Sequence, residues 1–551
     1  MCASDCISST KKENTNVNGS SNNNDVSGNG HTKAPNTIIE STINNNNNNN
    51  ATMKRRRSKY DRNTLIVRKE PNKKTKRKKK NKKSSSEFDR NQIMTTLLPS
   101  IIGVIVGLCA LAAKLGFRGR ATVAGIDLGT TNSVICVQAP SKSVGEIICI
   151  PDSKTNSSII PSVVSVSFDN NKNRKAPRSV VVGNEAKKRI DTHPHSTVYH
   201  AKRVIGRRYD DKAVSELKEE VEFIVGDNNT QPCFLSECLS PEQIGSYVLK
   251  YLLDITSTYF GYSSITSAVI TIPAEFTAQQ RIATVNAYKL ANIKVVRMME
   301  EPTAAALAYG LHKKEGVEHV LVYDFGGGTL DVSVLRIGQQ GYVDVMGSAG
   351  DSNLGGADFD DALVKYVLKN DNFVQSFHNL LQNYQINEEL LYTTCNIDTK
   401  HHLCTVSSLH TIAERIKIQL SSNPNITTVT DHCLTFDDTT TDAIIDTTNL
   451  ELEHKSLCSK LNTKHEIIMS KHDFYSAVHH LYPRSVQPIR KVLHELDLNH
   501  DDIDEVVMVG GTTRMLHIRD LVKEEFAHIK ELNTQIDPDI TVAYGAASVI
   551  D

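Results

Sequence analysis

Two stretches of the sequence share one design: an apolar strand ending in an aspartate, a glycine-containing turn, and a second apolar strand. The first stretch, residues 123–137, carries Asp127, and the second, residues 320–335, carries Asp324. Glycine at such a turn lets backbone N–H groups approach an anion without a Cβ in the way. One copy alone would be an ordinary hairpin. Two copies that face each other predict a site that binds a single polyphosphate between them.

The two aspartates would repel phosphate if they touched it directly. They suit a nucleotide site if Mg²⁺ and its waters lie between, because Mg²⁺ keeps several waters and takes few protein ligands. Two further glycine-rich segments fit the same site. Residues 506–514 could leave room for adenosine beside Gly510 and Gly511, and residues 350–356 could close over the phosphates.

The rival nucleotide motifs are missing from the sequence. It has no G-x-x-x-x-G-K-[ST] loop and no ordered kinase set of H-R-D and D-F-G. A dinucleotide-binding turn would lead from a strand into a helix, whereas these glycine turns lead into strands.

The segments that must position these turns follow an α/β rhythm from Thr122 onward, with β-branched runs such as 268–272 alternating with helical patterns such as 278–291. Ser240 to Gln243 fits an N-cap, a first-turn proline and a capping box. Pro302 can open an alanine-rich helix that Gly310 closes. The repeated design, about 200 residues apart, predicts two similar lobes that face each other across a cleft.

The first 93 residues are a basic arm, with 21 Lys and Arg against 8 Asp and Glu. They are rich in Asn, Ser and Lys and lack periodic apolar positions, which predicts disorder. Its clusters at 54–57 and 73–83 suit a nuclear signal, an anionic surface or the cytoplasmic flank of an anchor. The remainder of the chain is acidic, which argues against nucleic-acid binding by the folded part.

An uncharged apolar run follows the arm at residues 97–113. About 17 residues is the lower limit for spanning a bilayer. Residues 94–117 are therefore predicted to be a signal anchor or a signal peptide, with a small-x-small cleavage site at Ala110 to Ala112 and a buried helix as the alternative. Basic residues stay on the cytoplasmic side, so the globular part is expected in the lumen. Whether Met1 or Met94 starts translation is left open.

The eleven cysteines include no C-x-x-C pair, so neither zinc-ribbon nor thioredoxin-like spacing is present. Most are expected to be small core residues. Cys233 and Cys238 could pair in an oxidising compartment, but an ordinary surface loop is favoured. No disulfide framework is expected in a chain of this size.

From Thr122 to its end the chain resembles the ATPase domain of the heat-shock protein 70 family. The resemblance implies a two-lobed actin-like ATPase fold with duplicated ribonuclease-H-like lobes, lobe I over about 122–313 and lobe II over about 314–551, with the nucleotide in the cleft. The matching segments occur in the family's order: Gly125–Ser133, Ala201–Gly206, Ile272–Phe276, Glu301–Ala306, Asp324–Asp331, Leu354–Gly356, Val509–Arg514 and Asp537–Asp539.

The resemblance also implies residue roles. Lys202 would reach the γ-phosphate and position the attacking water. Mg²⁺, held through water by Asp127 and Asp324, would be arranged by four carboxylates: Asp127, Glu301, Asp324 and Asp331. The phosphates would be held by Gly129, Thr130, Thr131, Asn132, Gly326, Gly327, Gly328, Thr329, Gly355 and Gly356. The adenosine side would be formed by Glu414, Lys417, Ser421, Gly510, Gly511, Thr512, Arg514 and Asp539.

The sequence departs from the family pattern in three places. Ile418 stands where the family has an arginine that stacks on adenine, and losing that stack is expected to cost about 1 kcal/mol of binding. Ala357 replaces an acidic residue. The family continues into a peptide-binding β-sandwich, but this sequence stops at Asp551. An ATPase domain behind an apolar segment, with no sandwich, resembles the microsomal stress-70 branch of the family, with a truncated gene model as the alternative.

The function expected from the resemblance is a slow, peptide-independent ATPase of chaperone type in the endoplasmic reticulum or microsomal lumen, which uses ATP and Mg²⁺. J-domain proteins and nucleotide-exchange factors are the expected partners, with no peptide site. Three alternatives stay open: a sugar-kinase-like phosphotransferase, an actin-like filament protein and a truncated full-length chaperone. Lys202 and the Glu301-Pro302 element favour water over a sugar as the phosphoryl acceptor.

Overall fold

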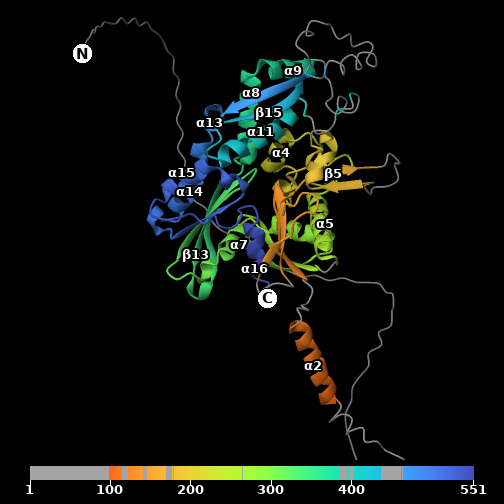
Figure 1. Ribbon diagram of the computed structural model, residues 1–551, viewed down its shortest axis with the longest axis vertical. Helices are drawn as coiled ribbons and strands as arrows, with labels where there is room; N and C mark the ends of the chain where they lie inside the picture. Colours follow the sequence, from red (N-terminus) through yellow and green to blue (C-terminus); the bar gives the residue numbers. More distant parts are fainter. Residues whose placement is uncertain are drawn as a thin grey trace, which may run out of the picture. The chain divides into compact units, whose positions relative to one another are not determined.

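The computed structural model describes most of the chain beyond residue 97 (Figure 1). The predicted basic arm, residues 1–93, lies outside the described residues. The residues described are 98–114, 122–139, 146–168, 177, 179–190, 192–262, 265–383, 395, 397, 402–435, 461 and 463–550.

The apolar run forms a helix, α2, at Leu98–Lys114. Its seventeen residues nearly coincide with the uncharged run at 97–113. Across the described ranges, no helix combines the length and the apolar character needed to cross a membrane.

A six-stranded sheet is the centre of the first lobe. Its strands run in the order β11-β10-β1-β2-β3, and β4 pairs with β2. β1 and β2 are antiparallel, and β10 runs parallel to β1. The bounds are β1 Val123–Leu128, β2 Asn132–Gln138, β3 Ile147–Cys149, β4 Ile160–Pro161, β10 Ser267–Ile272 and β11 Lys294–Glu300.

Helices α5 (Pro241–Phe260) and α6 (Ala278–Leu290) pack on one face of this sheet. Alternate residues of a strand point to opposite faces, so Ile126 and Leu128 meet these helices while the residues between them face away. The capping box predicted at Ser240 and Gln243 is confirmed, because each side chain bonds the other's backbone N–H. These caps fix where α5 begins.

The second lobe repeats the plan with a four-stranded sheet in the order β14-β13-β12-β17. β12 and β13 are antiparallel, and β17 runs parallel to β12, as β10 does to β1. The predicted internal repeat is therefore confirmed. The bounds are β12 His319–Phe325, β13 Leu330–Ile337, β14 Val343–Asp351 and β17 Glu505–Val509.

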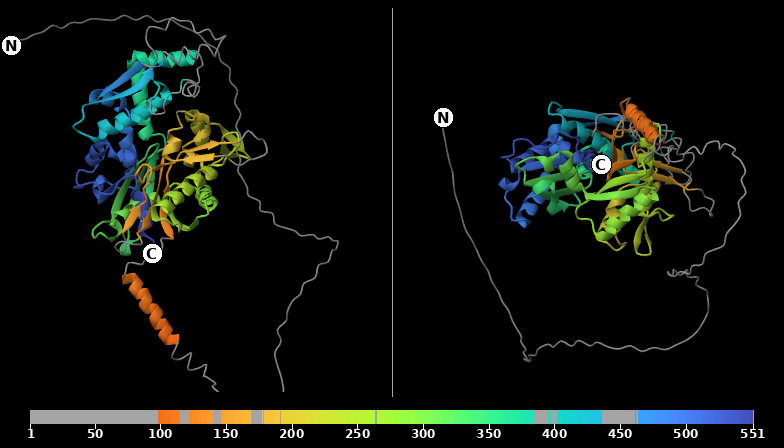
Figure 2. Two further views of the ribbon diagram at one scale, coloured as in Figure 1. Left: turned by 45° about the vertical axis from the view of Figure 1, so that its right-hand side comes forward. Right: turned by 90° about the horizontal axis from the view of Figure 1, so that it is seen from below.

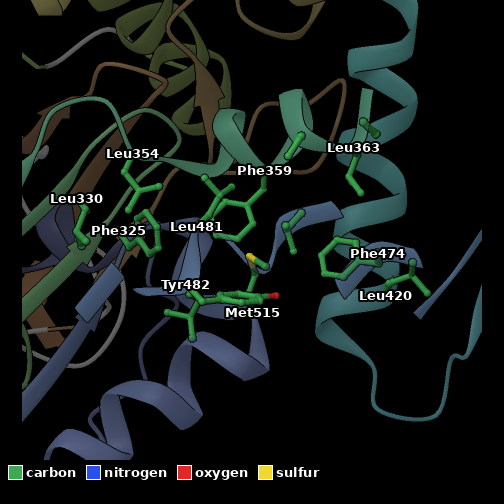
Figure 3. Close-up of a cluster of buried hydrophobic side chains, with 14 of the residues drawn as sticks. Phe325, Leu330, Leu354, Phe359, Leu363, Leu420, Phe474, Leu481, Tyr482 and Met515 are labelled. Atoms are coloured by element: carbon green, nitrogen blue, oxygen red, sulfur yellow. The ribbon is translucent and has the colours of Figure 1, made fainter. Parts of the chain in front are cut away.

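The core of the second lobe lies directly behind the turn between β12 and β13 (Figure 3). Phe325 and Leu330, which flank that turn, are fully buried with Leu354 and Phe359. Burying side chains of this size contributes about 1.5–3 kcal/mol each, so the turn is anchored from behind. The helices and the second sheet of this lobe are α8 Gly356–Asn370, α9 Asn372–Asn383, α11 Val406–Ser422, β15 Thr428–Thr435, β16 Thr463–Ser470, α13 Lys471–Val478, α14 Tyr482–Glu495 and α15 Leu516–Glu525.

Two helices, α7 (Glu301–Ala308) and α16 (Thr541–Ser548), pack against each other between the two main sheets (Figures 1 and 2). α16 contacts β1 and β2, and α7 contacts β12. A Cβ on Gly545 would overlap the Ala304 carbonyl, so the helices cross at backbone contact. Pro302 stands in the first turn of α7 and Gly310 follows it in the left-handed region, as predicted.

The remaining elements form a small antiparallel subdomain on the first lobe and short turns elsewhere. Strand β5 pairs with both β6 and β7, and β8 pairs with β9. The bounds are β5 Val164–Ser167, β6 Ser179–Val182, α3 Asn184–Lys187, η2 Pro194–Ser196, β7 Thr197–Val198, η3 Ala201–Val204, α4 Lys212–Glu220, β8 Val225–Asn228, β9 Gln231–Phe234, η4 Leu311–Lys313, η5 Gln339–Gly341, η7 His500–Asp502 and η8 Gly511–Arg514.

The expectation of unpaired cysteines is wrong. Cys233 and Cys238 form a disulfide across one tight loop, and two pairs that the sequence did not suggest also form. Spacing could not reveal those pairs, because neighbouring strands and a helix start bring the cysteines together. They are Cys136–Cys149, at paired positions of β2 and β3, and Cys404–Cys433, which joins the start of α11 to β15.

Candidate functional site

The two predicted phosphate turns face each other across the lobes. Residues 129–131 connect β1 to β2, and residues 326–329 connect β12 to β13. A Cβ built on Gly327 would lie 2.7 Å from the Thr131 hydroxyl oxygen, so the second turn approaches the first at van der Waals contact. Only glycine leaves this gap open, which suits a narrow anion site lined by backbone N–H groups.

The other two glycine-rich segments support the turn of the second lobe from behind. A Cβ on Gly355 would overlap the Gly328 backbone, and the Thr512 hydroxyl donates to the Gly326 carbonyl at 2.9 Å. Gly510 has φ 82° and sits against the Phe325 carbonyl. A residue with a side chain would be strained and would clash there. The sequence predicted that Gly355 and Gly356 belong to this site, but not that they back the turn.

The predicted acidic residues and Lys202 gather at the base of the cleft. Lys202 lies on η3 and donates to Glu301 Oε1 at 2.7 Å, with side chains that are only 8% and 17% exposed. Asp127, the second-to-last residue of β1, accepts from the Thr271 hydroxyl at 3.0 Å. Asp324 and Asp331 are register partners on β12 and β13.

The carboxylates at the cleft base carry unfavourable charge. Burial raises the pKa of Asp127 to about 6 and outweighs the attraction of Lys202, while Glu301 adds repulsion. Burial and the neighbouring carboxylates raise the pKa of Asp324 well above its usual range. For Lys202, burial lowers the pKa, but the Glu301 and Asp127 carboxylates outweigh it, so the net pKa is raised and the ammonium is retained.

The excess of negative charge at the base of the cleft suits the binding of a hydrated cation. Lys202 supplies the positive charge that acts on the carboxylates of Asp127, Glu301 and Asp324. Oxygen donors of this kind suit Mg²⁺, which binds through one or two carboxylates, several waters and substrate phosphates. Asp127 and Asp324, the second-to-last residues of equivalent strands in the two lobes, are the residues that would hold it. Within the described ranges, no three His, Cys, Asp or Glu side chains converge as direct ligands.

The raised pKa of the Asp127 carboxyl predicts that the unfolding free energy depends on pH. A carboxyl whose folded pKa lies above its unfolded value destabilises the fold once ionised, so this cost grows as the pH rises from about 4 to above 6. We expect Asp127→Asn to raise the unfolding free energy of the nucleotide-free, Mg²⁺-free chain by about 1–3 kcal/mol at pH 7.5 and by about half as much at pH 5. Denaturant titration at the two pH values measures the difference in unfolding free energy between this variant and the parent. A difference of equal size at both pH values would show that ionisation of Asp127 does not cause it.

Three residues of the predicted adenosine side, Glu414, Lys417 and Ser421, lie on α11. Glu414 bonds Lys187 of α3 at 2.6 Å, so this contact joins the two lobes, and Lys417 is buried against the turn at Gly356. Ile418 is 54% exposed. The Ser421 hydroxyl donates to the Lys417 carbonyl at 2.5 Å, so in this structure it bonds its own helix.

Arg514 lies at the end of η8 and is paired with two carboxylates. Its guanidinium donates to Asp539 at 2.8 and 3.1 Å and also bonds Asp537. A Cβ on Gly511 would lie 2.9 Å from the Asp539 carboxylate. The residues predicted around Gly510 and Arg514 therefore form one local group, with the arginine fixed by two carboxylates.

Three residues of the site were not singled out from the sequence: Lys187, Thr271 and Asp360. Thr271 could have been found, because it lies on β10 beside β1 and alternation turns it toward Asp127. Lys187 and Asp360 carry no sequence signal, since their partners on α11 are 227 and 57 residues away.

Two lobes with equivalent sheets, two opposed glycine turns and an acidic base with one buried lysine define an actin-like ATPase domain. The sequence comparisons agree. A family model described as "Hsp70 protein" matches residues 123–448 and 443–550. The chain belongs to the Hsp70 family.

Two relatives illustrate the similarity. The chaperone protein dnaK of Cyanidium caldarium is 34% identical over 433 residues, which cover 77% of this chain and 60% of the relative. The mitochondrial iron-sulfur cluster biogenesis chaperone of Saccharomyces cerevisiae is 34% identical over 431 residues, which cover 77% of this chain and 58% of the relative. The chain thus spans less than two thirds of the length of these relatives.

Proposed function

We propose that this chain binds ATP with Mg²⁺ and slowly hydrolyses it to ADP and phosphate, as a chaperone-type ATPase. The observation that carries the proposal is the pair of glycine turns that face each other at Gly327 and Thr131, next to two aspartates that interact with the buried Lys202–Glu301 pair. Turns of this kind bind phosphates through backbone N–H groups. The acidic base below them supplies the complementary place for a divalent cation.

The proposed chemistry assigns each group one task. Bound Mg²⁺ would supply neutralisation of phosphate charge beside Asp127 and Asp324. Lys202 keeps its proton through Glu301, so it can stabilise charge that develops on the γ-phosphoryl group and hold the attacking water. Thr271 orients the Asp127 carboxylate. Glu414, Lys417 and Arg514 would bind the adenosine.

Every residue of this site lies between 127 and 539, so we propose that hydrolysis by this domain does not require a peptide. Members of the Hsp70 family work with J-domain proteins and nucleotide-exchange factors, and these are the partners we expect. Phosphate release by the purified chain, with and without sugars and unfolded peptides, tests the proposal. ADP and phosphate in equal amounts, unchanged by either addition, are expected. A sugar phosphate product or the absence of phosphate release would overturn it.

We also propose that the domain resides in the lumen of the endoplasmic reticulum, as in the microsomal branch of the family, behind a signal peptide at residues 94–117. Three disulfides in the described part of the chain support this compartment, because disulfides persist where the environment is oxidising. The apolar helix α2, preceded by a basic segment, suits a translocation signal.

The lumenal location predicts glycosylation. Three N-x-[ST] sequons follow the apolar helix, at Asn156, Asn228 and Asn425, and all three asparagines are exposed. We expect at least one to carry a glycan, whereas Asn18 and Asn50 in the basic arm should not. Gel mobility before and after endoglycosidase treatment measures glycosylation. Protease protection in sealed microsomes measures whether the domain lies in the lumen. An unglycosylated chain digested outside the vesicles would contradict the location while leaving the ATPase proposal standing.

A further inference from the structure

A buried ion pair links the adenosine helix to the phosphate side of the site. Lys417 on α11 donates to Asp360 Oδ2 at 2.7 Å and to the Gly356 carbonyl at 2.8 Å. Both side chains are almost enclosed, with 11% and 12% of their surfaces exposed. A buried ion pair generally stabilises a fold no more than an apolar pair of the same volume would. Stability alone therefore does not explain why this pair is buried here.

The Gly356 end of this pair is attached to the phosphate turn by backbone hydrogen bonds. The Gly356 N–H donates to the Gly326 carbonyl at 3.1 Å, and the Ala357 N–H donates to the Gly327 carbonyl at 2.8 Å. Asp360 lies one turn further along the same helix, α8. Lys417 is therefore fixed to the segment that supports the turn 326–329.

The Lys417 end is attached to the other lobe. Glu414 lies one helical turn before Lys417 on α11 and bonds Lys187 of the first lobe at 2.6 Å. A continuous set of contacts thus runs from the first lobe, through α11 and Asp360, to the phosphate turn of the second lobe. Such contacts couple two parts of a binding site when ligand binding at each part favours the same conformation of the element between them.

The carboxylate of Asp360 is incompletely satisfied in this arrangement. Its second oxygen, Oδ1, is buried and has no hydrogen-bond partner. Burial raises the pKa of Asp360 to about 6 although Lys417 opposes the shift. Buried polar atoms are nearly always paired, so an orphan oxygen beside a binding site marks a contact kept for a reason other than stability.

We propose that Asp360 is a positioning residue of the nucleotide site, which holds Lys417 against the Gly356 carbonyl and thereby couples adenosine binding on α11 to the phosphate turn. This inference rests on the proposed ATP site. It concerns the link between the two halves of that site, and not the contacts that either half makes with nucleotide.

The test separates the two halves of the ligand. Competition against a fluorescent ADP analogue gives Kd for ATP and for inorganic tripolyphosphate on the full chain, and phosphate release gives kcat and KM. We expect Asp360→Asn to weaken ATP binding about tenfold, a size typical of coupling between sites, and to raise KM in parallel. Tripolyphosphate binding and kcat should stay within about twofold, because the phosphate turn itself is intact.

A matched control lies on the same helix. Arg415 of α11 bonds Asp431 of β15 at 2.8 Å, a pair of similar length that joins α11 to the β15–β16 sheet instead of to α8. Asp431→Asn should leave both binding constants within about twofold of the parent, since no coupling passes through it. Equal effects of the two variants, or an equal loss of tripolyphosphate and ATP affinity, would reduce Asp360 to a purely structural role and overturn the proposal.

Two further variants keep the test decisive. Lys187→Ala combined with Asp360→Asn should give a non-additive loss of ATP affinity, because both act through α11, whereas additive losses would contradict the link. If Asp360→Asn does not fold, Asp360→Glu replaces it, since it keeps the charge but displaces the carboxylate from Lys417. The same pattern is then expected. A parent chain that binds no ATP would overturn the proposed function itself, and this inference with it.

Discussion

Replacing Lys202 by alanine should lower kcat by about 10²–10³-fold and leave ATP binding nearly unchanged. Removing one donor that acts on developing charge has an effect of this size. Lys202 is buried and fixed by Glu301 at 2.7 Å, so its ammonium is held in one place at the base of the cleft. An interaction made mainly in the transition state appears in kcat, whereas a ground-state contact appears in KM.

Single-turnover phosphate release and equilibrium binding of ATP, each with Mg²⁺, distinguish these cases for Lys202→Ala. Lys314→Ala is the control, because it removes another lysine that bonds a glutamate, Glu505, away from the cleft. That variant should match the parent. Parallel loss of binding and turnover in Lys202→Ala would show that the lysine serves ground-state binding or the fold of the cleft.

The sequence predicted the parts of the fold that local chemistry determines. The capping residues at Ser240 and Gln243 and the proline and glycine at the ends of α7 each act within a few residues, so local patterns sufficed. The repeated Asp-Gly turns also predicted two equivalent sheets, because the same strand-turn-strand design needs the same partners. The family resemblance added the positions of Lys202 and the residues of α11.

The sequence could not predict contacts that depend on how distant segments pack. The Lys187–Glu414 bond crosses the lobes, and the Asp360–Lys417 pair joins two helices of the second lobe. Neither pair follows from spacing, since each joins residues far apart in the chain. The bonds from Arg514 to Asp537 and Asp539 likewise depend on the packing of η8 against the segment that follows α15.

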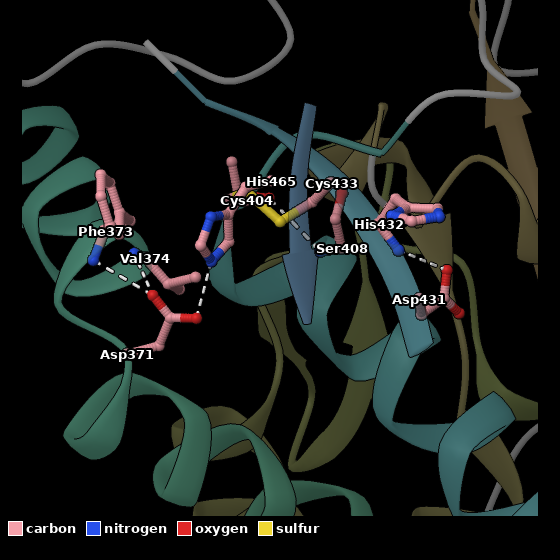
Figure 4. Close-up of a disulfide and its surroundings, with 10 residues drawn as sticks. Asp371, Phe373, Val374, Cys404, Ser408, Asp431, His432, Cys433 and His465 are labelled. Carbon is pink, nitrogen blue, oxygen red and sulfur yellow. Dashed lines mark hydrogen bonds and ion pairs between the residues drawn. A yellow bond between two sulfur atoms is a disulfide. The ribbon is translucent and has the colours of Figure 1, made fainter. Parts of the chain in front are cut away.

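The cysteines show the same limit most clearly. Only Cys233 and Cys238 lie close enough in the sequence to suggest a pair, yet Cys136 and Cys149 also meet, because β2 and β3 are neighbours in the sheet. Cys404 precedes the N-cap of α11, Thr405, and meets Cys433 because β15 runs beside the start of that helix (Figure 4). The tertiary fold, and not the spacing, selects these partners.

The Cys404–Cys433 disulfide should be a major source of stability for the second lobe. Replacing both cysteines by serine is expected to lower the unfolding free energy by about 3–4 kcal/mol, because the cross-link spans 29 residues and restricts the unfolded chain. Both cysteines are buried, so the bond needs local opening before a reductant can reach it. The Cys404 N–H still bonds the Leu434 carbonyl at 3.0 Å, which should keep the start of α11 in place in the variant.

Denaturant titration under non-reducing conditions measures this effect, and the Cys233–Cys238 pair supplies the control. That disulfide spans only 5 residues, so its double serine variant should lose about 2 kcal/mol. Adding a reductant should make the unfolding free energies of the parent and each variant more similar, because it breaks the same disulfide in the parent. Equal losses for the two pairs, or no loss for the longer one, would mean that the cross-link adds little beyond the backbone contact between α11 and β15.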